Sequence, residues 1–266
     1  MTRPPLGFVL LLAGILLPAC AATTTGPKAD DSTAPTTGDA PESVAPTTAP
    51  PSAPVWSVTS EPDGTGEPVS VDDLQPFVTD ERTWFVLKGK SAGSTVERSR
   101  KPTSAHHATW EADQGDGDIH FLVRTDDGGV ALAAVEANRD KALSLFDPPL
   151  GVSPAELHPG ETFERKARMK VTDLDDEQKI QQRGTATRRL EHLGSVQVST
   201  SAGSRTVQVL RMEFRADLDL AKATTETFLY VVPGEGVIAL KSREVVKAAL
   251  IFNRTVDWEI VRLGDR

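Results

Sequence analysis

Apolar and polar residues alternate along several stretches of the chain, and a period of two residues is typical of β-strands with one buried face. The clearest example is ETFERKARMKVT at 161–172. One side of this stretch carries Phe163, Arg165, Ala167, Met169 and Val171, whereas polar and charged residues occupy the other. The pattern predicts an antiparallel strand that packs one face on a core and exposes the other.

A hairpin is predicted in VQVSTSAGSRTVQV at 196–209, where two short alternating stretches flank the turn residues Ser-Ala-Gly-Ser. The apolar phase then shifts by one residue, because Val207 and Val209 are followed by Leu210 and Met212. Since neighbouring side chains of a strand point to opposite faces, this shift predicts a β-bulge or a strong bend.

Further strands are predicted at 83–87, 119–123, 225–232, 236–246 and 255–263. Prolines such as those at 148, 149 and 233 are expected between strands, where a missing N–H costs nothing.

Short strands separated by frequent turns predict an all-β fold. We expect an antiparallel curved meander, or an open or half barrel, with at most one or two short helices. The predicted helix is VDDLQPF at 71–77, and the segment 129–146 is either a helix or two strands joined at 137–140.

The N-terminal segment has the pattern of an export signal. A cationic start is followed by an apolar block from Leu6 to Leu17, which is too short for a transmembrane helix. The residues Leu17-Pro18-Ala19-Cys20 resemble the lipobox of bacterial lipoproteins. This resemblance implies a signal peptide at 1–19, cleavage between Ala19 and Cys20, and a diacylglycerol on Cys20. The alternative is a chance cysteine in an ordinary cleaved signal.

Residues 20–54 have the composition of a tether. They are rich in proline, threonine and alanine and contain one large aliphatic residue, Val44, so they are predicted to form a disordered linker after the lipid anchor. One β-rich domain is expected at 55–266. The lipobox implies a protein held in the cell envelope with its domain outside the cytoplasm. The same resemblance favours the outer membrane if the organism has one, because Ala21 rather than aspartate follows the cysteine.

The net charge and the number of cysteines exclude some classes of partner and site. A net charge of -9 and a pI near 5.1 argue against nucleic acid as a partner, because phosphate binding needs a concentrated basic surface. The single cysteine excludes an intrachain disulfide and a cysteine-based zinc cluster.

Ser91 is the candidate nucleophile, because Gly89-Lys90-Ser91-Ala92-Gly93 fits the G-x-S-x-G pattern of hydrolases. That pattern requires a following helix and a surrounding parallel sheet, whereas the residues after it are polar and end at Pro102. A hairpin turn is therefore the preferred interpretation.

Three polar groups suggest metal or phosphate sites, and each has a simpler interpretation. The cluster Asp113, Asp116 and Asp118 suits calcium but is more typical of a solvated turn. His106-His107, with His120 beyond, point to opposite faces of a strand and so are expected at the surface or partly buried. Arg188-Arg189 is expected on a solvated strand face. We expect no cofactor and no metal.

Three segments from 146 to 244 carry a family resemblance: FDPPLGVSPAELHPGETF, then GSVQVSTSAGSRTVQVLRMEF, then TTETFLYVVPGEGVIALKSRE. They resemble a family of uncharacterised exported bacterial proteins that have a hairpin at a small "AG" turn and an aromatic strand entering "PGxG". The resemblance implies an antiparallel sheet wrapped as an open barrel and no particular activity.

Three functions follow as hypotheses. The first is a non-catalytic envelope lipoprotein whose β-domain contacts a protein or a wall polymer. The second is a carrier of a lipid or other hydrophobic ligand in a half-open barrel. The third is a hydrolase that uses Ser91.

Overall fold

The computed structural model describes residues 53–248 and 252–263. The described chain is nearly all β-structure, and every strand pairing in it is antiparallel. The predicted fold class is therefore confirmed. The proposed signal peptide, Ala19, Cys20 and nearly all of the 20–54 tether lie outside the described residues.

The elements run in the following order along the chain: β1 (Trp56–Val58), β2 (Val69–Ser70), α1 (Val71–Leu74), β3 (Asp80–Lys88), β4 (Thr95–Pro102), a 3-10 turn (Ala105–His107), β5 (Trp110–Asp113), β6 (Asp118–Arg124), β7 (Val130–Ala137), β8 (Ala142–Ser153), β9 (Glu156–Leu157), β10 (Thr162–Asp173), β11 (Asp176–Thr200), β12 (Gly203–Leu218), β13 (Ala221–Val232), β14 (Gly236–Ala248) and β15 (Phe252–Arg262).

The described strands form a closed barrel of 12 strands in which neighbours in sequence are neighbours in space. From β3 to β15 each strand pairs with the next, except that β8 pairs with β10 and the short β9 pairs with β2. The last strand, β15, then pairs with the first, β3, from Glu259↔Lys88 to Arg262↔Trp84. The expected meander is present, and this seam closes it into a full ring rather than an open or half barrel.

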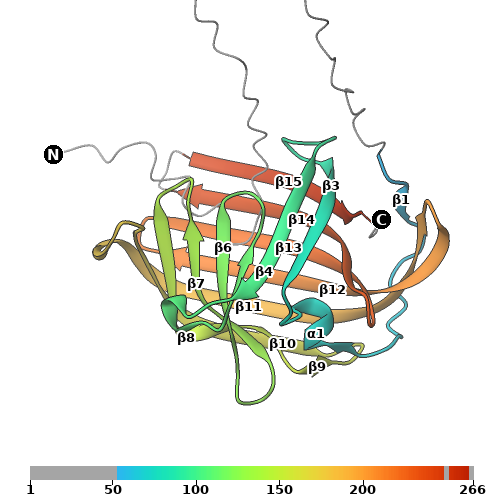
Figure 1. The fold of residues 1–266 in the computed structure, drawn as a ribbon, viewed down its shortest axis with the longest axis horizontal. Helices are drawn as coiled ribbons and strands as arrows, with labels where there is room; N and C mark the ends of the chain where they lie inside the picture. Colours follow the sequence, from blue (N-terminus) through green and yellow to red (C-terminus); the bar gives the residue numbers. More distant parts are fainter. Residues whose placement is uncertain (1–52, 249–251, 264–266) are drawn as a thin grey trace, which may run out of the picture.

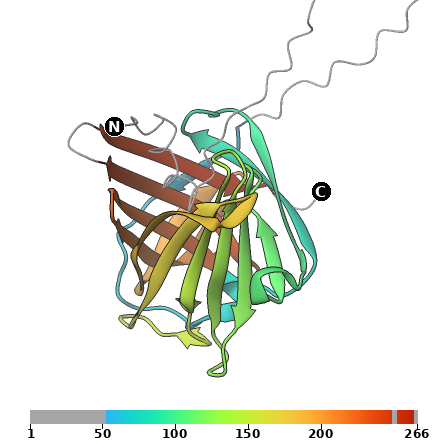
Figure 2. The same ribbon diagram turned by 90° about the vertical axis from the view of Figure 1, so that its left-hand side faces the viewer.

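The barrel is flattened, so that two groups of strands face each other. In Figure 1 the green strands β4 to β8 run steeply across the orange and red strands β12 to β15, and Figure 2 shows the same two groups from the side. The short strand β1 lies outside the ring and pairs with the end of β11 at residues 198–200.

The barrel interior holds two adjoining clusters of buried side chains. One gathers around Leu132, Phe146 and Phe214, and the other around Trp84 and Ile260. Since burying apolar surface is the main favourable term in folding, these clusters account for most of the stability of the ring. A third cluster, which includes Val207 and Val209, extends to Trp56 of β1.

A single helical turn packs against the β13–β14 hairpin. The Ser70 side chain accepts from the Asp73 N–H while an Asp73 carboxylate oxygen accepts from the Ser70 N–H, which is a capping box. The other carboxylate oxygen of Asp73 accepts from the Gly234 N–H at 2.7 Å. A helix is present in the predicted segment 71–77, but α1 ends at Leu74; it lies near the lower end of β3 in Figure 1.

The structure decides the open alternatives of the sequence. Residues 130–153 form two strands, β7 and β8, so the helical alternative for 129–146 is excluded. The bulge predicted near Leu210 lies in the neighbouring strand, at the register shift between His192 and Gly194. Strand β12 itself stays regular, and its residues 207–210 are buried on both faces.

One proline prediction is wrong. Pro148 and Pro149 lie inside β8 rather than between strands. They are tolerated there because the pairing of β8 with β7 is interrupted at this level, where the register shifts between Leu132 and Ala134.

Gly184 is predicted to be indispensable for the packing of β11 against β12. A Cβ atom at this position would lie 2.0 Å from the backbone oxygen of Asp217 and 2.8 Å from the Cα of Leu218. We expect Gly184→Ala to lower the free energy of unfolding by about 1–3 kcal/mol, because backbone atoms of two strands must separate. Urea unfolding measures the change, with Thr185→Ala as the control. Equal stabilities of the two variants would show that β11 and β12 can move apart without a loss of free energy of unfolding.

Candidate functional site

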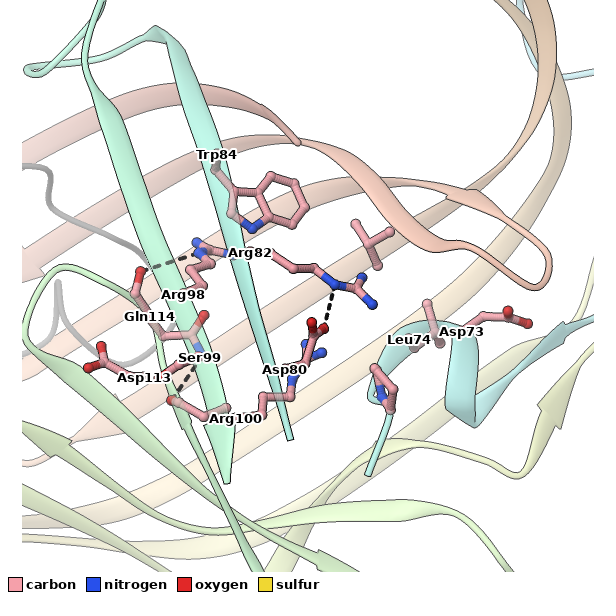
Figure 3. A pocket seen from close by; sticks show the side chains of 13 residues that line it. Asp73, Leu74, Asp80, Arg82, Trp84, Arg98, Ser99, Arg100, Asp113 and Gln114 are labelled. Atoms are coloured by element: carbon pink, nitrogen blue, oxygen red, sulfur yellow. Dashed lines mark hydrogen bonds and ion pairs between the residues drawn. The ribbon is translucent and has the colours of Figure 1, made fainter. Parts of the chain in front are cut away.

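A cavity of about 100 Å³ lies inside the barrel where the two interior clusters meet. Leu132 and Val152 line it from one cluster, and Trp84, Leu240 and Trp258 line it from the other. A second cavity of about 40 Å³ adjoins it and shares Leu74, Trp84, Arg98, Arg100, Gln114 and Val237 as lining residues. Figure 3 shows this second cavity, with Arg98 of β4 beside Trp84 of β3, Arg100 further along β4, and Asp73 and Leu74 of α1 on the right.

Strand alternation places the cationic residues in the interior. On β4, Arg98 and Arg100 follow the buried Val96 at intervals of two residues, so the three share one face. Their partners on β3 are Arg82 and Asp80, respectively. On β11, Arg188 lies between Ala186 and Leu190, which are also buried. The cavity is thus reached by side chains from strands that are distant in sequence.

Arg188 is the most isolated of these cations. Only 7 % of the residue is exposed, and its Nε atom has no hydrogen-bond partner. It lies directly opposite Phe214 of β12. Burial alone lowers the pKa of the Arg188 guanidinium to about 10, and no carboxylate offsets this effect. The side chain is therefore charged at neutral pH and uncompensated.

His120 of β6 contributes a neutral imidazole to the same cavity. Its pKa is lowered to about 3, first by burial and then by the charges of Arg188, Arg98 and Arg100. Its Nε2 atom is buried and has no hydrogen-bond partner. The three arginines thus lie near enough to His120 for their charges to lower its pKa.

The other two arginines have partial compensation. The Arg98 Nε–H donates to the Gln114 backbone oxygen at 3.2 Å, and its guanidinium lies 5.3 Å from the centre of the Trp84 ring. The half-buried Arg100 has its pKa lowered to about 10 by burial and by Arg82, with Asp80 acting in the opposite direction. Asp80 itself forms an ion pair with Arg82, as Figure 3 shows.

Two tryptophans that line the cavity have unpaired N–H donors. The indole Nε1 atoms of Trp84 and Trp258 are buried without a partner. Buried polar groups are hydrogen-bonded in the great majority of cases, so each such atom calls for an explanation. Trp84 and Trp258 both line the cavity, together with Arg188 and His120.

A separate group of interior carboxyls lies on β6, on β14 and in the turn before β6. Burial is the largest influence on Asp118, whose pKa is raised to about 9, and on Glu244, whose pKa is raised to about 8. Asp116 also has a raised pKa because of burial, and it accepts from the Asp118 N–H at 3.0 Å. None of these carboxyls lines the 100 Å³ cavity.

Glu244→Gln is predicted to flatten the pH dependence of stability. The folded-state pKa of Glu244 is raised, so the folded chain keeps a proton that the unfolded chain releases above pH 4.5. The free energy of unfolding of the wild type therefore falls as the pH rises from about 4.5 to about 8. The variant has no carboxyl at this position, so it does not show this fall.

We expect the stability difference between variant and wild type to grow across that window by a few kcal/mol. Urea unfolding at several pH values measures it. The control is Glu164→Gln, which removes an exposed carboxylate of β10. A difference that stays constant with pH would contradict the assignment of a protonated Glu244.

Ser91 lies in the turn between β3 and β4. The Ser94 hydroxyl donates to the Ser91 backbone oxygen at 2.7 Å, and the Gly93 N–H donates to the Val86 oxygen at 2.8 Å, which closes a hairpin. No helix follows it in the described chain before the 3-10 turn at 105–107, and the sheet is antiparallel. The predicted hairpin turn is confirmed, and the setting of a nucleophile elbow is missing.

The candidate metal ligands are not brought together. His106 and His107 lie in the 3-10 turn and His106 contacts Glu136 at 2.9 Å, whereas His120 lies in the barrel interior. Asp113 is exposed and accepts from the Gly115 N–H, while Asp116 and Asp118 are buried. Within residues 53–248 and 252–263, no group of three or more histidine and acidic residues is placed to hold a metal ion.

The prediction for Arg188 is wrong. The sequence pattern places it on a solvated strand face, but the side chain points into the barrel. Only its neighbour Arg189 lies outside, with Glu191 at 3.5 Å. The signal that could have identified it is the alternation of Ala186, Arg188 and Leu190, which marks one face of a strand. The runs 95–102 and 176–195 contain too few apolar residues to read as strands, so Arg98 and Arg100 were missed as well.

Comparisons with protein-family models, with curated proteins and with solved structures found no match. No helix in the described part of the chain is long and apolar enough to span a bilayer.

Proposed function

We propose that this chain is an exported, membrane-anchored lipoprotein whose barrel binds a small amphiphilic molecule in its interior without transforming it. The observation that carries the proposal is the cavity between the two interior clusters. The residues that line it include apolar side chains and polar side chains that carry buried atoms without partners. Mostly apolar concave sites with a few placed polar groups are the usual form of a small-molecule site.

The volume of the cavity limits the size of the ligand. Drug-sized ligands occupy clefts of roughly 300–1,000 Å³, so a cavity of about 100 Å³ suits a compact molecule rather than a long lipid chain. Because benzene binds in a cavity of roughly 150 Å³, a ligand with one aromatic ring needs this cavity together with the adjoining one of about 40 Å³. The carrier hypothesis of the sequence is thereby restricted to small ligands or to the head of a larger one.

This proposal replaces an interaction surface as our first hypothesis. Contact with an envelope protein or a wall polymer remains a second hypothesis that follows from the predicted anchor. Ligand binding comes first because the cavity gives the interior a defined chemistry. The Ser91 hydrolase is not proposed, because the hairpin around Ser91 lacks the setting that activates a nucleophile.

The ligand is sought by native mass spectrometry of the full chain isolated from a bacterial envelope, followed by solvent extraction. We expect a reproducible extra mass that is released as a small organic molecule. The control is Leu229→Trp, which adds volume to a residue that lines the cavity and should displace the ligand. An unliganded wild-type chain, indistinguishable from the filled variant, would contradict the proposal.

The anchor has its own test. We expect Cys20→Ser to move the protein from the membrane fraction to the soluble fraction and to abolish incorporation of labelled fatty acid, because the thiol is the proposed acyl acceptor. Thr24→Ala is the control and should stay in the membrane fraction. A Cys20→Ser protein that still sediments with membranes would exclude this anchor.

A further inference from the structure

We propose that the ligand is an anion, a carboxylate or phosphate monoester with an apolar body, whose charged group binds at Arg188, Arg98 and Arg100. The apolar body then lies along Trp84 and Trp258. This inference rests on the proposed function and adds the chemical class of the ligand.

The charge of the cavity wall is the first argument. Three arginines line the 100 Å³ cavity, and none of its described lining residues is acidic. The chain as a whole is acidic, with a net charge of -9, so this cationic interior is a local arrangement rather than a result of composition. A guanidinium matches the geometry of carboxylates and phosphates with two parallel hydrogen bonds.

The interior carboxyls share Arg98 with the proposed anion site, but they do not share Arg188. Asp116 is influenced by Arg98 and Arg139, Asp118 by Arg139, and Glu244 by Arg254. Burial is the one influence given for the pKa of Arg188, and no carboxyl contributes to it. A buried charge without a partner is costly, and a chain retains one most readily where an external group completes it.

Four residues that line the cavity each carry a buried polar atom without a partner. These atoms are the Nε of Arg188, the Nε1 of Trp84 and Trp258, and the Nε2 of His120. Guanidinium and indole N–H groups only donate, and a neutral imidazole can donate through one nitrogen. An anion offers acceptors and no competing donors, so it satisfies this set better than an alcohol or an amine.

Isothermal titration calorimetry of the full chain carrying Cys20→Ser tests the inference with four probes of similar shape: benzoate, phenyl phosphate, benzyl alcohol and benzylamine. We expect benzoate or phenyl phosphate to bind at least tenfold more tightly than benzyl alcohol, and benzylamine to bind least. The two anions separate carboxylate from phosphate recognition.

Arg188→Gln removes the charge and should weaken binding of the preferred anion at least tenfold. Arg189→Gln is the matched control, because this neighbouring arginine faces outward to Glu191, and it should bind as the wild type does. Arg188→Lys keeps the charge without the planar fork and should lie between the two. If Arg188→Gln does not fold, the binding of Arg188→Lys is compared with that of the wild type instead.

Each outcome has one meaning. Preferential anion binding that depends on Arg188 supports the inference. Equal binding of benzyl alcohol and the anions, or anion binding that Arg188→Gln and Arg188→Lys leave unchanged, overturns it and leaves the proposed ligand-binding function standing. Absence of binding for all four probes, together with an unliganded chain from the envelope, overturns both.

Discussion

Replacing Arg188 with methionine is expected to stabilise the ligand-free protein while it abolishes anion binding. The guanidinium lies opposite Phe214, with its pKa lowered by burial and without a carboxylate partner. Exchanging buried charged groups for apolar side chains of similar volume often stabilises a protein by about 1–4 kcal/mol. Because a domain of this size gains roughly 2–4 °C per kcal/mol, the unfolding temperature should rise by several degrees.

Differential scanning calorimetry without ligand measures this change, and Arg189→Met is the control on the outer face of the same strand. A gain in stability together with a loss of binding is the signature of a residue kept for function. A marked fall in the unfolding temperature of Arg188→Met would instead show that the guanidinium has a structural partner in the folded chain.

Ile260→Ala is expected to cause the largest loss of stability. This side chain is fully buried, and it is paired with Val86 across the β15–β3 seam that closes the ring. Truncating a buried isoleucine to alanine costs about 2–5 kcal/mol, through lost burial and the void that remains. We expect the upper part of this range, because only four residue pairs join β15 to β3.

Ile180→Ala is the matched control for this substitution. Ile180 is 40 % exposed near the β10–β11 turn, so its truncation should change the free energy of unfolding by less than about 1 kcal/mol. Urea unfolding compares the two variants. If Ile260→Ala were as mild as Ile180→Ala, the β15–β3 seam would not be part of the cooperative fold.

The strands that alternate clearly were predictable from the sequence. Strand β10 shows a buried face of Ala167, Met169 and Val171, as its pattern indicates, and the hairpin at 200–203 follows from its turn residues. Strands with polar interior faces were not predictable in this way. In β4 the inward residues after Val96 are arginines, and the periodicity that marks a strand depends on apolar residues.

The site could not be assembled from the sequence for a topological reason. Arg98, His120 and Arg188 lie on β4, β6 and β11, and they share a cavity only because β15 pairs with β3 and closes the ring. Local patterns do not specify that seam. The sequence shows two adjacent arginines, Arg188 and Arg189, and this suggests one basic surface spot. Adjacent residues of a strand face opposite sides, however, so only one of the two can lie on the surface.

The central claim, a ligand site inside the barrel, is tested most directly by a crystal of the chain soaked in 4-bromobenzoate. The anomalous signal of bromine locates the molecule without prior assumptions. We predict one strong bromine position inside the barrel between Trp84 and Trp258, with the carboxylate toward Arg188. Bromine bound only on the outer surface, with an empty cavity at saturating concentration, would contradict the claim.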